Sequence, residues 1–391
     1  MKILNLKYLF DGLKNILRQL YVLYSKPINI YANKSSKKRV LVSYLKSPFY
    51  LKNRPIKHAN VIECRSIAKI FRNLGYTVDV VDWRCKRNIR YQDYDVIFGF
   101  GLPFRRSFEK DHNIKKICYL AGSSPNFSNT NEAKRIRDIF QNKGVLLEPR
   151  REVYWKWMHV AINSDLLIVG GNKETASTYL DYVSNIETIP IPAIPLQKTI
   201  QSDSIEKGIL WFGGAGAVHK GLDLVLEGLS KFDQEFNLDV CGPIENELDF
   251  FNLYEQHFKS KQVNFHGMID PSSKQMEEIV KRNSFIILPS CSEGMPSSVS
   301  TCMQLGLIPI VTKECGFDTN DKFAIEIEDL TISSVKNSIE KALKLEEDKI
   351  LDMKNEAIKY AKKIHSKQNY EDRLLEILLE FENSYFKETR Y

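Results

Sequence analysis

Short apolar segments alternate with amphipathic segments over most of the chain beyond residue 37, and this alternation constrains the fold more than any other feature. In the first half, strands are predicted at 38–45, 77–83, 94–101, 115–122 and 164–171, with helices at 58–76 and 172–183. Strands that alternate with helices form parallel sheets covered by helices on both faces. The sequence therefore predicts an α/β protein with doubly wound, Rossmann-like sheets.

A cluster of prolines divides this pattern into two parts. Pro190, Pro192 and Pro195 interrupt regular strand pairing, which is typical of a linker. The alternation then restarts, with strands predicted at 208–214, 237–242, 263–267, 285–290 and 308–312. For 391 residues, at about 150 residues per domain, two domains are expected, at 38–195 and 196–369.

Both ends of the chain are amphipathic. The last segment, 370–391, is predicted to be a helix that packs back on the first domain, because an apolar face needs a partner surface. That face carries Leu374, Leu375, Leu378, Leu379 and Phe381. The first segment, 1–37, alternates leucines with lysines and predicts a basic amphipathic helix. Two interpretations of this helix stay open: it lies on an anionic membrane surface, or it packs on the body of the protein.

Charge is divided unevenly between the two halves. Residues 1–200 hold 34 Lys and Arg against 16 Asp and Glu, whereas residues 201–391 hold 22 against 33. The basic first half suits an anionic partner or membrane surface. The seven cysteines include no Cys-x-x-Cys pair, which predicts reduced thiols. Reduced thiols predict a cytoplasmic protein, and no apolar run reaches the ~18 residues of a membrane span. A peripheral position on the inner face of the cell membrane follows only if segment 1–37 lies on the membrane surface.

A glycine-rich loop follows the first predicted strand of the second half. It contains Gly213, Gly214 and Gly216, and Lys220 stands at its far edge. Glycines make a concavity without side chains, and one lysine adds positive charge, so the loop suits a diphosphate group. The spacing matches neither the dinucleotide fingerprint nor the P-loop.

A second loop follows the predicted strand 285–290 and carries Glu293 and Gly294, ahead of a helix predicted to begin near Pro296. Ligands of open α/β sheets bind at such carboxyl ends of strands. Free backbone amides at Ser297 and Ser298 would receive phosphate or sugar oxygens. Considered alone, the loop is explained equally well as an ordinary capped turn.

Together the two loops resemble the donor domain of a GT-B glycosyltransferase of the retaining family 4, also called group 1. The resemblance implies that Lys220 binds the nucleotide diphosphate and that Glu293 faces the donor sugar. It also implies a phosphate-facing turn made by Gly294, Met295, Pro296, Ser297 and Ser298. The motifs that carry the resemblance lie within 208–312. Over 38–391 the resemblance extends only to the overall architecture, in which two Rossmann-like domains face each other across a cleft.

Two positions depart from the family pattern. The second Glu of the Glu-x7-Glu motif holds the nucleotide ribose in the family, and its place is taken here by Thr301, which offers one hydroxyl instead. The arginine that precedes the lysine in the family is absent. A catalytically inactive homologue is therefore one alternative.

Contacts to the acceptor are expected from the first half. His58 lies between the first strand and the first helix, where it would contact the acceptor oxygen as a catalytic general base or cap the helix. Gly122 and Ser123 follow another strand end, and Arg135 and Arg150 contribute to the basic excess, which suits a phosphorylated or lipid-linked acceptor. A capping serine and a solvated basic surface are the alternative interpretations.

The expected function is transfer of a sugar from a nucleotide-diphosphate sugar, as co-substrate, to a glycan or lipid-linked saccharide in bacterial surface polysaccharide synthesis. No group of carboxylates or histidines has the spacing of metal ligands, so we expect transfer without a metal or other cofactor. A nucleotide-sugar epimerase of the same fold stays an alternative. A nucleic-acid-binding protein is another alternative. The basic strands lack interleaved aromatic residues, so nucleic acid is not an expected partner.

Overall fold

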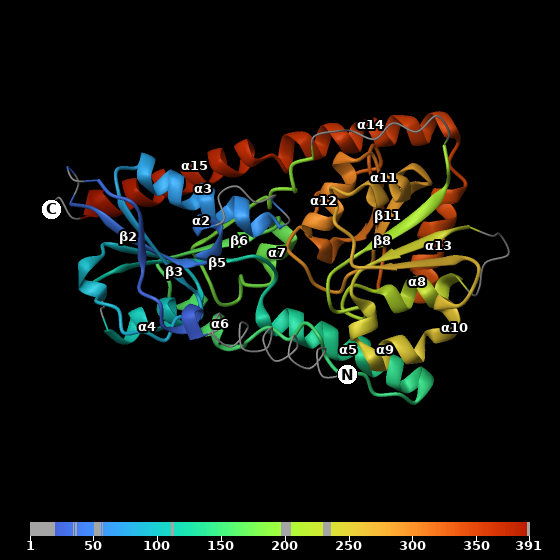
Figure 1. Ribbon diagram of the computed structural model, residues 1–391, viewed down its shortest axis with the longest axis horizontal. Helices are drawn as coiled ribbons and strands as arrows, with labels where there is room; N and C mark the ends of the chain where they lie inside the picture. The colour runs from blue at the N-terminus through green and yellow to red at the C-terminus, as the bar shows by residue number, and fades with distance from the viewer. Residues whose placement is uncertain are drawn as a thin grey trace, which may run out of the picture.

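The computed structural model describes residues 20–33, 35, 37–50, 56, 58–110, 113–196, 205–229 and 236–388. These residues form two α/β lobes that lie side by side along the long axis of the molecule, each built on its own sheet (Figure 1). The segment 1–19, which holds most of the expected N-terminal amphipathic helix, lies outside the described residues.

The first lobe contains a seven-stranded sheet with the order β1-β3-β2-β4-β5-β6-β7. Its strands are β1 (Ile28–Tyr31), β2 (Arg39–Tyr44), β3 (Thr77–Asp82), β4 (Val96–Gly99), β5 (Lys115–Leu120), β6 (Leu166–Gly170) and β7 (Ile186–Ile189). Neighbouring strands pair in parallel except β1, which is antiparallel to β3 at the sheet edge. The sequence pattern does not predict β1, because its four residues are too few to show a period.

Helices cover both faces of this sheet, because its central strands are apolar on both faces. Val40 and Val42 of β2 pack in one buried cluster, and Leu41 between them packs in another. Side chains alternate along a strand, so these two clusters lie on opposite faces. The helices of this lobe are α2 (Ser47–Tyr50), α3 (Ala59–Asn73), α4 (Gly101–Lys110), α5 (Pro125–Lys143), α6 (Lys156–Ile162) and α7 (Lys173–Ser177).

The second lobe contains a six-stranded parallel sheet with the order β10-β9-β8-β11-β12-β13. Its strands are β8 (Gly208–Phe212), β9 (Leu238–Cys241), β10 (Val263–Gly267), β11 (Asn283–Leu288), β12 (Ile308–Thr312) and β13 (Ile325–Ile327). The chain order reverses between β8 and β11, which pair directly, with Ile286 opposite Leu210. The loops that follow these two strands therefore emerge together at a topological switch point, where ligands bind in sheets of this kind.

The helices of the second lobe follow the same alternation. They are α8 (Leu222–Leu229), α9 (Leu248–Leu253), α10 (Glu255–Phe258), α11 (Lys274–Lys281), α12 (Ser297–Gln304), α13 (Ile332–Leu343) and α14 (Glu347–Ile364). With the first lobe, they confirm the predicted fold class of two Rossmann-like α/β units.

The lobes are joined at opposite edges of the molecule (Figure 1). Along one edge, α14 is followed by α15 (Lys367–Glu388), which returns to the first lobe and packs on α3 through Tyr370, Leu374 and Leu378. Leu379, expected on the same face, is 42% exposed. Along the other edge, α5 extends across, and its Ile136 and Ile139 pack in the core of the second lobe.

Candidate active site

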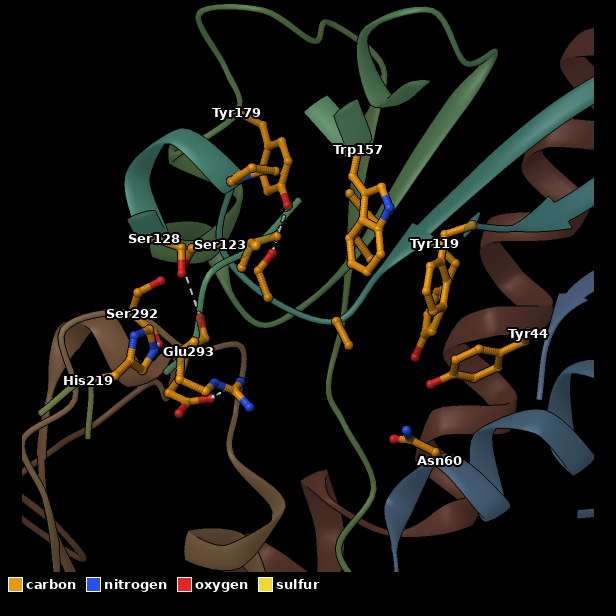
Figure 2. Close-up of a pocket in the computed structure, with 17 residues that line it drawn as sticks. Tyr44, Asn60, Tyr119, Ser123, Ser128, Trp157, Tyr179, His219, Ser292 and Glu293 are labelled. Carbon is orange, nitrogen blue, oxygen red and sulfur yellow. Dashed lines mark hydrogen bonds and ion pairs between the residues drawn. The ribbon is translucent and has the colours of Figure 1, made fainter. Parts of the chain in front are cut away.

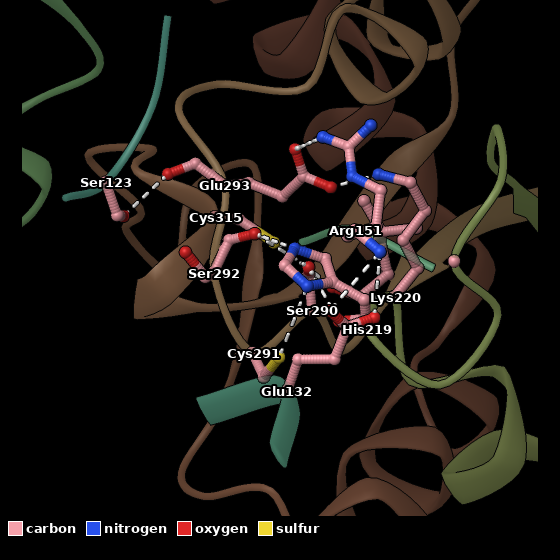
Figure 3. A network of polar contacts seen from close by, with 12 residues as sticks. Ser123, Glu132, Arg151, His219, Lys220, Ser290, Cys291, Ser292, Glu293 and Cys315 are labelled. Carbon is pink, nitrogen blue, oxygen red and sulfur yellow. Dashed lines mark hydrogen bonds and ion pairs between the residues drawn. The ribbon is translucent and has the colours of Figure 1, made fainter. Parts of the chain in front are cut away.

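Lys220 and Glu293 form an ion pair at the switch point of the second sheet (Figure 3). Lys220 ends the glycine-rich segment after β8, and Glu293 lies in the loop after β11. Because β8 and β11 are neighbours, the two loops meet. The Lys220 ammonium donates a hydrogen bond to the Glu293 carboxylate, and the two side chains are only 7% and 10% exposed. The sequence motif thus pointed to two residues that the fold brings together.

Positive charge keeps Glu293 ionised in this buried position. Burial alone favours the neutral carboxyl, but Lys220 and Arg151 outweigh it, and the pKa of Glu293 falls to about 2. Burial lowers the pKa of the adjacent His219 to about 4, so its imidazole is neutral at pH 7. The Nε2 atom of His219 contacts the carbonyl oxygen of Ser292, which can only accept, so Nε2 carries the proton.

Arg151 reaches this ion pair from the first lobe. Its backbone amide donates to the Glu132 carboxylate of α5, at 3.1 Å from Oε1, which fixes the start of the side chain. The side chain crosses Gly216, where an added Cβ would lie 2.3 Å from the Cγ of Arg151. Its guanidinium ends 4.0 Å from Oε2 of Glu293. Two cations from different lobes therefore flank one carboxylate.

Part of the glycine-rich loop is already bonded to a carboxylate of the protein, Glu247, whereas the sequence predicted an open concavity. The amides of Gly216 and Ala217 donate to the two oxygens of Glu247, at 2.6 and 3.0 Å. They are therefore not available to a diphosphate. Gly213 packs on Trp211, with room for no Cβ, whereas the space around Gly214 is open. The accessible part of this loop is thus Gly214 together with Lys220.

The Glu293 loop touches the first lobe through backbone atoms. A Cβ on Gly294 would lie 2.3 Å from the carbonyl oxygen of Gly170 and 2.5 Å from Cα of Gly122. Glycine at 294 therefore permits close contact between the lobes. The Ser123 hydroxyl adds a hydrogen bond to the carbonyl oxygen of Glu293, at 3.0 Å (Figure 2). Gly122 and Ser123 thus lie at the boundary between the lobes, and both also line the cavity on the first-lobe side of Glu293.

The start of α12 offers free hydrogen-bond donors. Pro296 occupies the N-cap position without a side-chain cap, and the amides of Ser297 and Ser298 have no partner within the described part of the chain. The adjacent Met295 is buried, with φ +55° and its amide bonded to the carbonyl oxygen of Cys315, so it shapes the turn rather than facing outward. Oxygens of a ligand would therefore be received by the two serine amides.

Thr301 lies away from this surface. It is fully buried in α12, and its hydroxyl accepts a hydrogen bond from the amide of Ile194 at 3.2 Å. This contact ties the segment 190–196 to the second lobe. The placement differs from the ribose contact that the family pattern implied, because the hydroxyl is already used and no ligand can approach it.

A cavity of about 230 Å³ lies on the first-lobe side of Glu293 (Figure 2). Five aromatic residues contribute to its walls, namely Tyr44, Phe100, Tyr119, Trp157 and Tyr179. The three tyrosine hydroxyls bond to protein atoms, namely to the Glu63 carboxylate and to the carbonyl oxygen of Gly122. We call this space the aromatic cavity.

Sequence reasoning missed the aromatic cavity, although a signal was present. Tyr44 ends β2, Tyr119 lies one residue before the end of β5, and Phe100 directly follows β4. These strands are neighbours in the parallel sheet, so aromatic residues at their carboxyl ends converge.

Three residues expected to contact the acceptor bond to other protein atoms in the structure. His58 caps α3, with Nδ1 accepting from the amide of Asn60 at 3.2 Å, and Asn60 rather than His58 lines the aromatic cavity. Arg135 is buried in an ion pair with Asp223 of the second lobe. Arg150 pairs with Asp249 at 2.5 Å, also across the boundary between the lobes.

No group of three or more His, Cys, Asp or Glu side chains that could hold a metal ion occurs among the described residues. Within the same part of the chain, none of the helices has the length and hydropathy of a membrane span.

One known family is similar to the second lobe. Residues 198–364 match the family described as glycosyl transferases group 1. The match covers both loops that carry Lys220 and Glu293, together with the start of α12. No curated protein sequence matches the chain.

Solved structures share the architecture of both lobes. Sucrose-phosphate synthase from Thermosynechococcus elongatus superposes with a TM-score of 0.63 at 12% identity, covering 89% of this chain and 100% of that chain. Anabaena HepE, in complex with UDP and glucose, gives 0.59 at 11% identity, covering 88% and 99%. A mutant of S. aureus TarM in complex with UDP gives 0.52 at 15% identity, covering 73% and 55%. The fold is therefore GT-B, and together with the family match it supports an enzyme of glycosyl transfer.

Proposed function

We propose that this protein is a family 4 glycosyltransferase that moves a sugar from a nucleotide-diphosphate sugar to a hydroxyl of a glycan or lipid-linked saccharide. The position of the Lys220–Glu293 pair carries the proposal. Glu293 lines the aromatic cavity of the first lobe and stands four residues before the free amides at the start of α12. One carboxylate therefore borders both a place for a donor and a place for an acceptor.

The donor diphosphate is proposed to bind Lys220, Arg151 and the amides of Ser297 and Ser298. In the structure Glu293 neutralises Lys220. A diphosphate would draw both cations toward its own oxygens, which leaves Glu293 to accept hydrogen bonds from the hydroxyls of the donor sugar. The same cations would stabilise the negative charge that develops on the leaving diphosphate.

The acceptor sugar is proposed to occupy the aromatic cavity, whose ring surfaces suit the apolar faces of a saccharide. Its hydroxyl oxygen forms a bond to the anomeric carbon of the donor sugar. The bond from that carbon to the diphosphate breaks, the electron pair leaves with the nucleoside diphosphate, and the hydroxyl proton passes to an oxygen of the leaving diphosphate. Room for a second substrate beside Glu293 favours a transferase over an epimerase, which needs no acceptor.

Further details belong to the same proposal. UDP in the complexes of HepE and TarM supports a nucleotide-sugar donor, with UDP-sugars as the first candidates. We also propose that transfer needs no metal and that the domains divide at 38–195, 196–369 and 370–391. A role in surface polysaccharide synthesis at the inner face of the membrane is supported by the basic first half.

The proposal is tested by thermal unfolding with a panel of UDP-, GDP- and dTDP-sugars. One member should stabilise the protein, by about 2.7 kcal/mol at 100 times its dissociation constant. Lys220→Met and Glu293→Gln should each remove the stabilisation and reduce transfer of labelled sugar, because Lys220 binds the diphosphate and Glu293 the sugar.

Lys261→Met is the matched control, since Lys261 is an exposed lysine of the same lobe with no contact to the site. It should behave as the unmodified protein. Retention of the stabilisation by both site variants, or failure of every nucleotide sugar to stabilise the protein, would contradict the proposal.

A further inference from the structure

A second cavity adjoins the aromatic cavity in the first lobe, and five basic side chains line it. We call this cavity, of about 650 Å³, the basic groove. Its basic residues are Arg84, Lys86, Arg105, Arg150 and Arg151. They come from the turn after β3, from α4 and from the segment after α5, so the fold gathers charges that are up to 67 positions apart in the sequence.

Among the described residues, two of these cations have no partner of opposite charge. Arg84 donates to Asp82 at 3.0 Å, and Arg150 pairs with Asp249. The side chains of Lys86 and Arg105 make no hydrogen bond or ion pair within the described part of the chain. Glu152 is the one carboxylate among the described residues that line the groove. The groove therefore keeps an excess of positive charge, which favours an anionic ligand.

The groove is built on fixed backbone. The amide of Lys86 donates to the carbonyl oxygen of Leu23 at 2.6 Å, and the carbonyl oxygen of Lys86 accepts from Arg106, also at 2.6 Å. Arg105 projects from α4, a regular helix. Lys86 and Arg105 thus start from an ordered main chain, so no ordering of the backbone is needed when their side chains bind a ligand.

The basic groove and the aromatic cavity are continuous. Arg151, Val153 and Trp157 line both. The Trp157 ring packs against Phe100 of the aromatic cavity, with 5.0 Å between ring centres, and edge-on against Trp83 of the groove, with 6.0 Å. A ligand whose sugar lies in the aromatic cavity can therefore extend into the groove along this aromatic wall.

We propose that the basic groove binds the phosphate of a phosphorylated acceptor whose sugar occupies the aromatic cavity. This inference rests on the proposed function, because it takes the aromatic cavity as the acceptor site. Guanidinium groups present paired donors that match phosphate oxygens, and the groove contains several of them. Both a lipid-linked saccharide diphosphate and a soluble sugar phosphate carry this chemistry, and the tryptophan surface beside the cations suits a hydrocarbon chain.

The test is isothermal titration calorimetry of the full chain with two probes, geranyl diphosphate and glucose 1-phosphate. A double variant, Lys86→Gln with Arg105→Gln, should bind the probe about tenfold more weakly than the unmodified protein, because contacts to charged groups are lost. Lys134→Gln with Arg137→Gln removes the same two residue types from exposed positions of α5 outside the groove and should leave binding unchanged.

The outcomes separate the possible sources of the phosphate. Groove-dependent binding of geranyl diphosphate alone supports a lipid-linked acceptor, and groove-dependent binding of both probes supports any sugar phosphate. Equal affinity in the unmodified protein and the groove variant overturns the proposal. Binding of phosphatidylglycerol vesicles that the groove variant loses, without groove-dependent binding of either probe, also overturns it, since the groove would then contact the membrane itself.

A further measurement keeps this inference distinct from the proposed function. Stabilisation by a nucleotide sugar depends on Lys220 and Glu293, so the groove variant should retain it. If no nucleotide sugar stabilises the unmodified protein while the groove still binds phosphate, the proposed function fails and the anion site stands.

Discussion

His219 and His365 are buried histidines, and burial lowers the pKa of each to about 4. His219 lies beside Glu293, whereas His365 follows α14 and contacts the carbonyl oxygen of Ile191 through Nδ1 at 2.8 Å. Both are neutral in the native protein at pH 7. In the unfolded chain a histidine takes up a proton near pH 6.5, the ordinary value.

Stability should therefore fall as the pH is lowered from about 6.5 to about 4. In this window the unfolded chain holds protons on these histidines that the native state does not, so protonation favours unfolding by about 1 kcal/mol per pH unit for each. Urea denaturation at several pH values measures the slope. The slope should become shallower in His365→Gln, and an unchanged slope would show that His365 does not contribute.

At the scale of single residues, the sequence predicted the parts of the site that short motifs encode. Lys220, Glu293 and the serine amides of α12 lie in two loops whose meeting follows from the order of parallel strands. The presence of Arg151 and Glu247 at the site could not be predicted, because each belongs to a segment distant in the sequence whose position depends on tertiary packing. The glycine spacing likewise cannot show that Glu247 already holds the amides of Gly216 and Ala217.

Helix α5 joins the two lobes although its sequence does not predict it. Its buried positions recur at helical spacing, but Ser128, Glu132 and Arg135 occupy the middle of that stripe, so the apolar period is absent. The local signals are the Ser124 cap, Pro125 in the first turn and Gly144 at φ +70° after the last turn. The polar stripe serves the second lobe, where Arg135 meets Asp223.

Arg135→Ala should destabilise the protein by about 3–5 kcal/mol, because it leaves the buried Asp223 carboxylate without its cation. Thermal unfolding provides the measurement. Arg137→Ala, an exposed arginine of the same helix, is the matched control and should change stability by no more than about 0.5 kcal/mol. Equal effects of the two substitutions would show that the Arg135–Asp223 pair does not stabilise the junction.

Most other elements follow the sequence pattern because their apolar residues keep a regular period. The strands predicted near 38–45 and 285–290 appear as β2 and β11. The helix expected at 172–183 is shorter, since α7 spans Lys173–Ser177 and turns follow it.

At the scale of the whole molecule, the core of the first lobe is completed by the last helix of the chain. α15 comes last in the sequence, yet Tyr370, Leu374 and Leu378 complete the cluster that covers one face of the first sheet. Leu374→Ala should therefore loosen the first lobe, with a loss of about 2–5 kcal/mol. Hydrogen exchange should accelerate in α3, which α15 covers, and stay unchanged in α8 of the second lobe.

Faster exchange in α8 as well would contradict this assignment, because it would mean that the two lobes unfold as one unit. Exposed Leu379→Ala, on the same helix, is the control and should leave exchange in α3 as it was.

The contact of Gly294 with Gly122 and Gly170 sets how far apart the two sides of the proposed active site stand. Main-chain atoms of both lobes touch there, and main chain cannot change rotamer as side chains do. With the lobes in this contact, the span from Lys220 to the aromatic cavity is set by the backbone rather than by side chains. Side-chain substitutions around the site can alter which groups are recognised, but the distance between the two proposed substrate sites is set by the backbone contact.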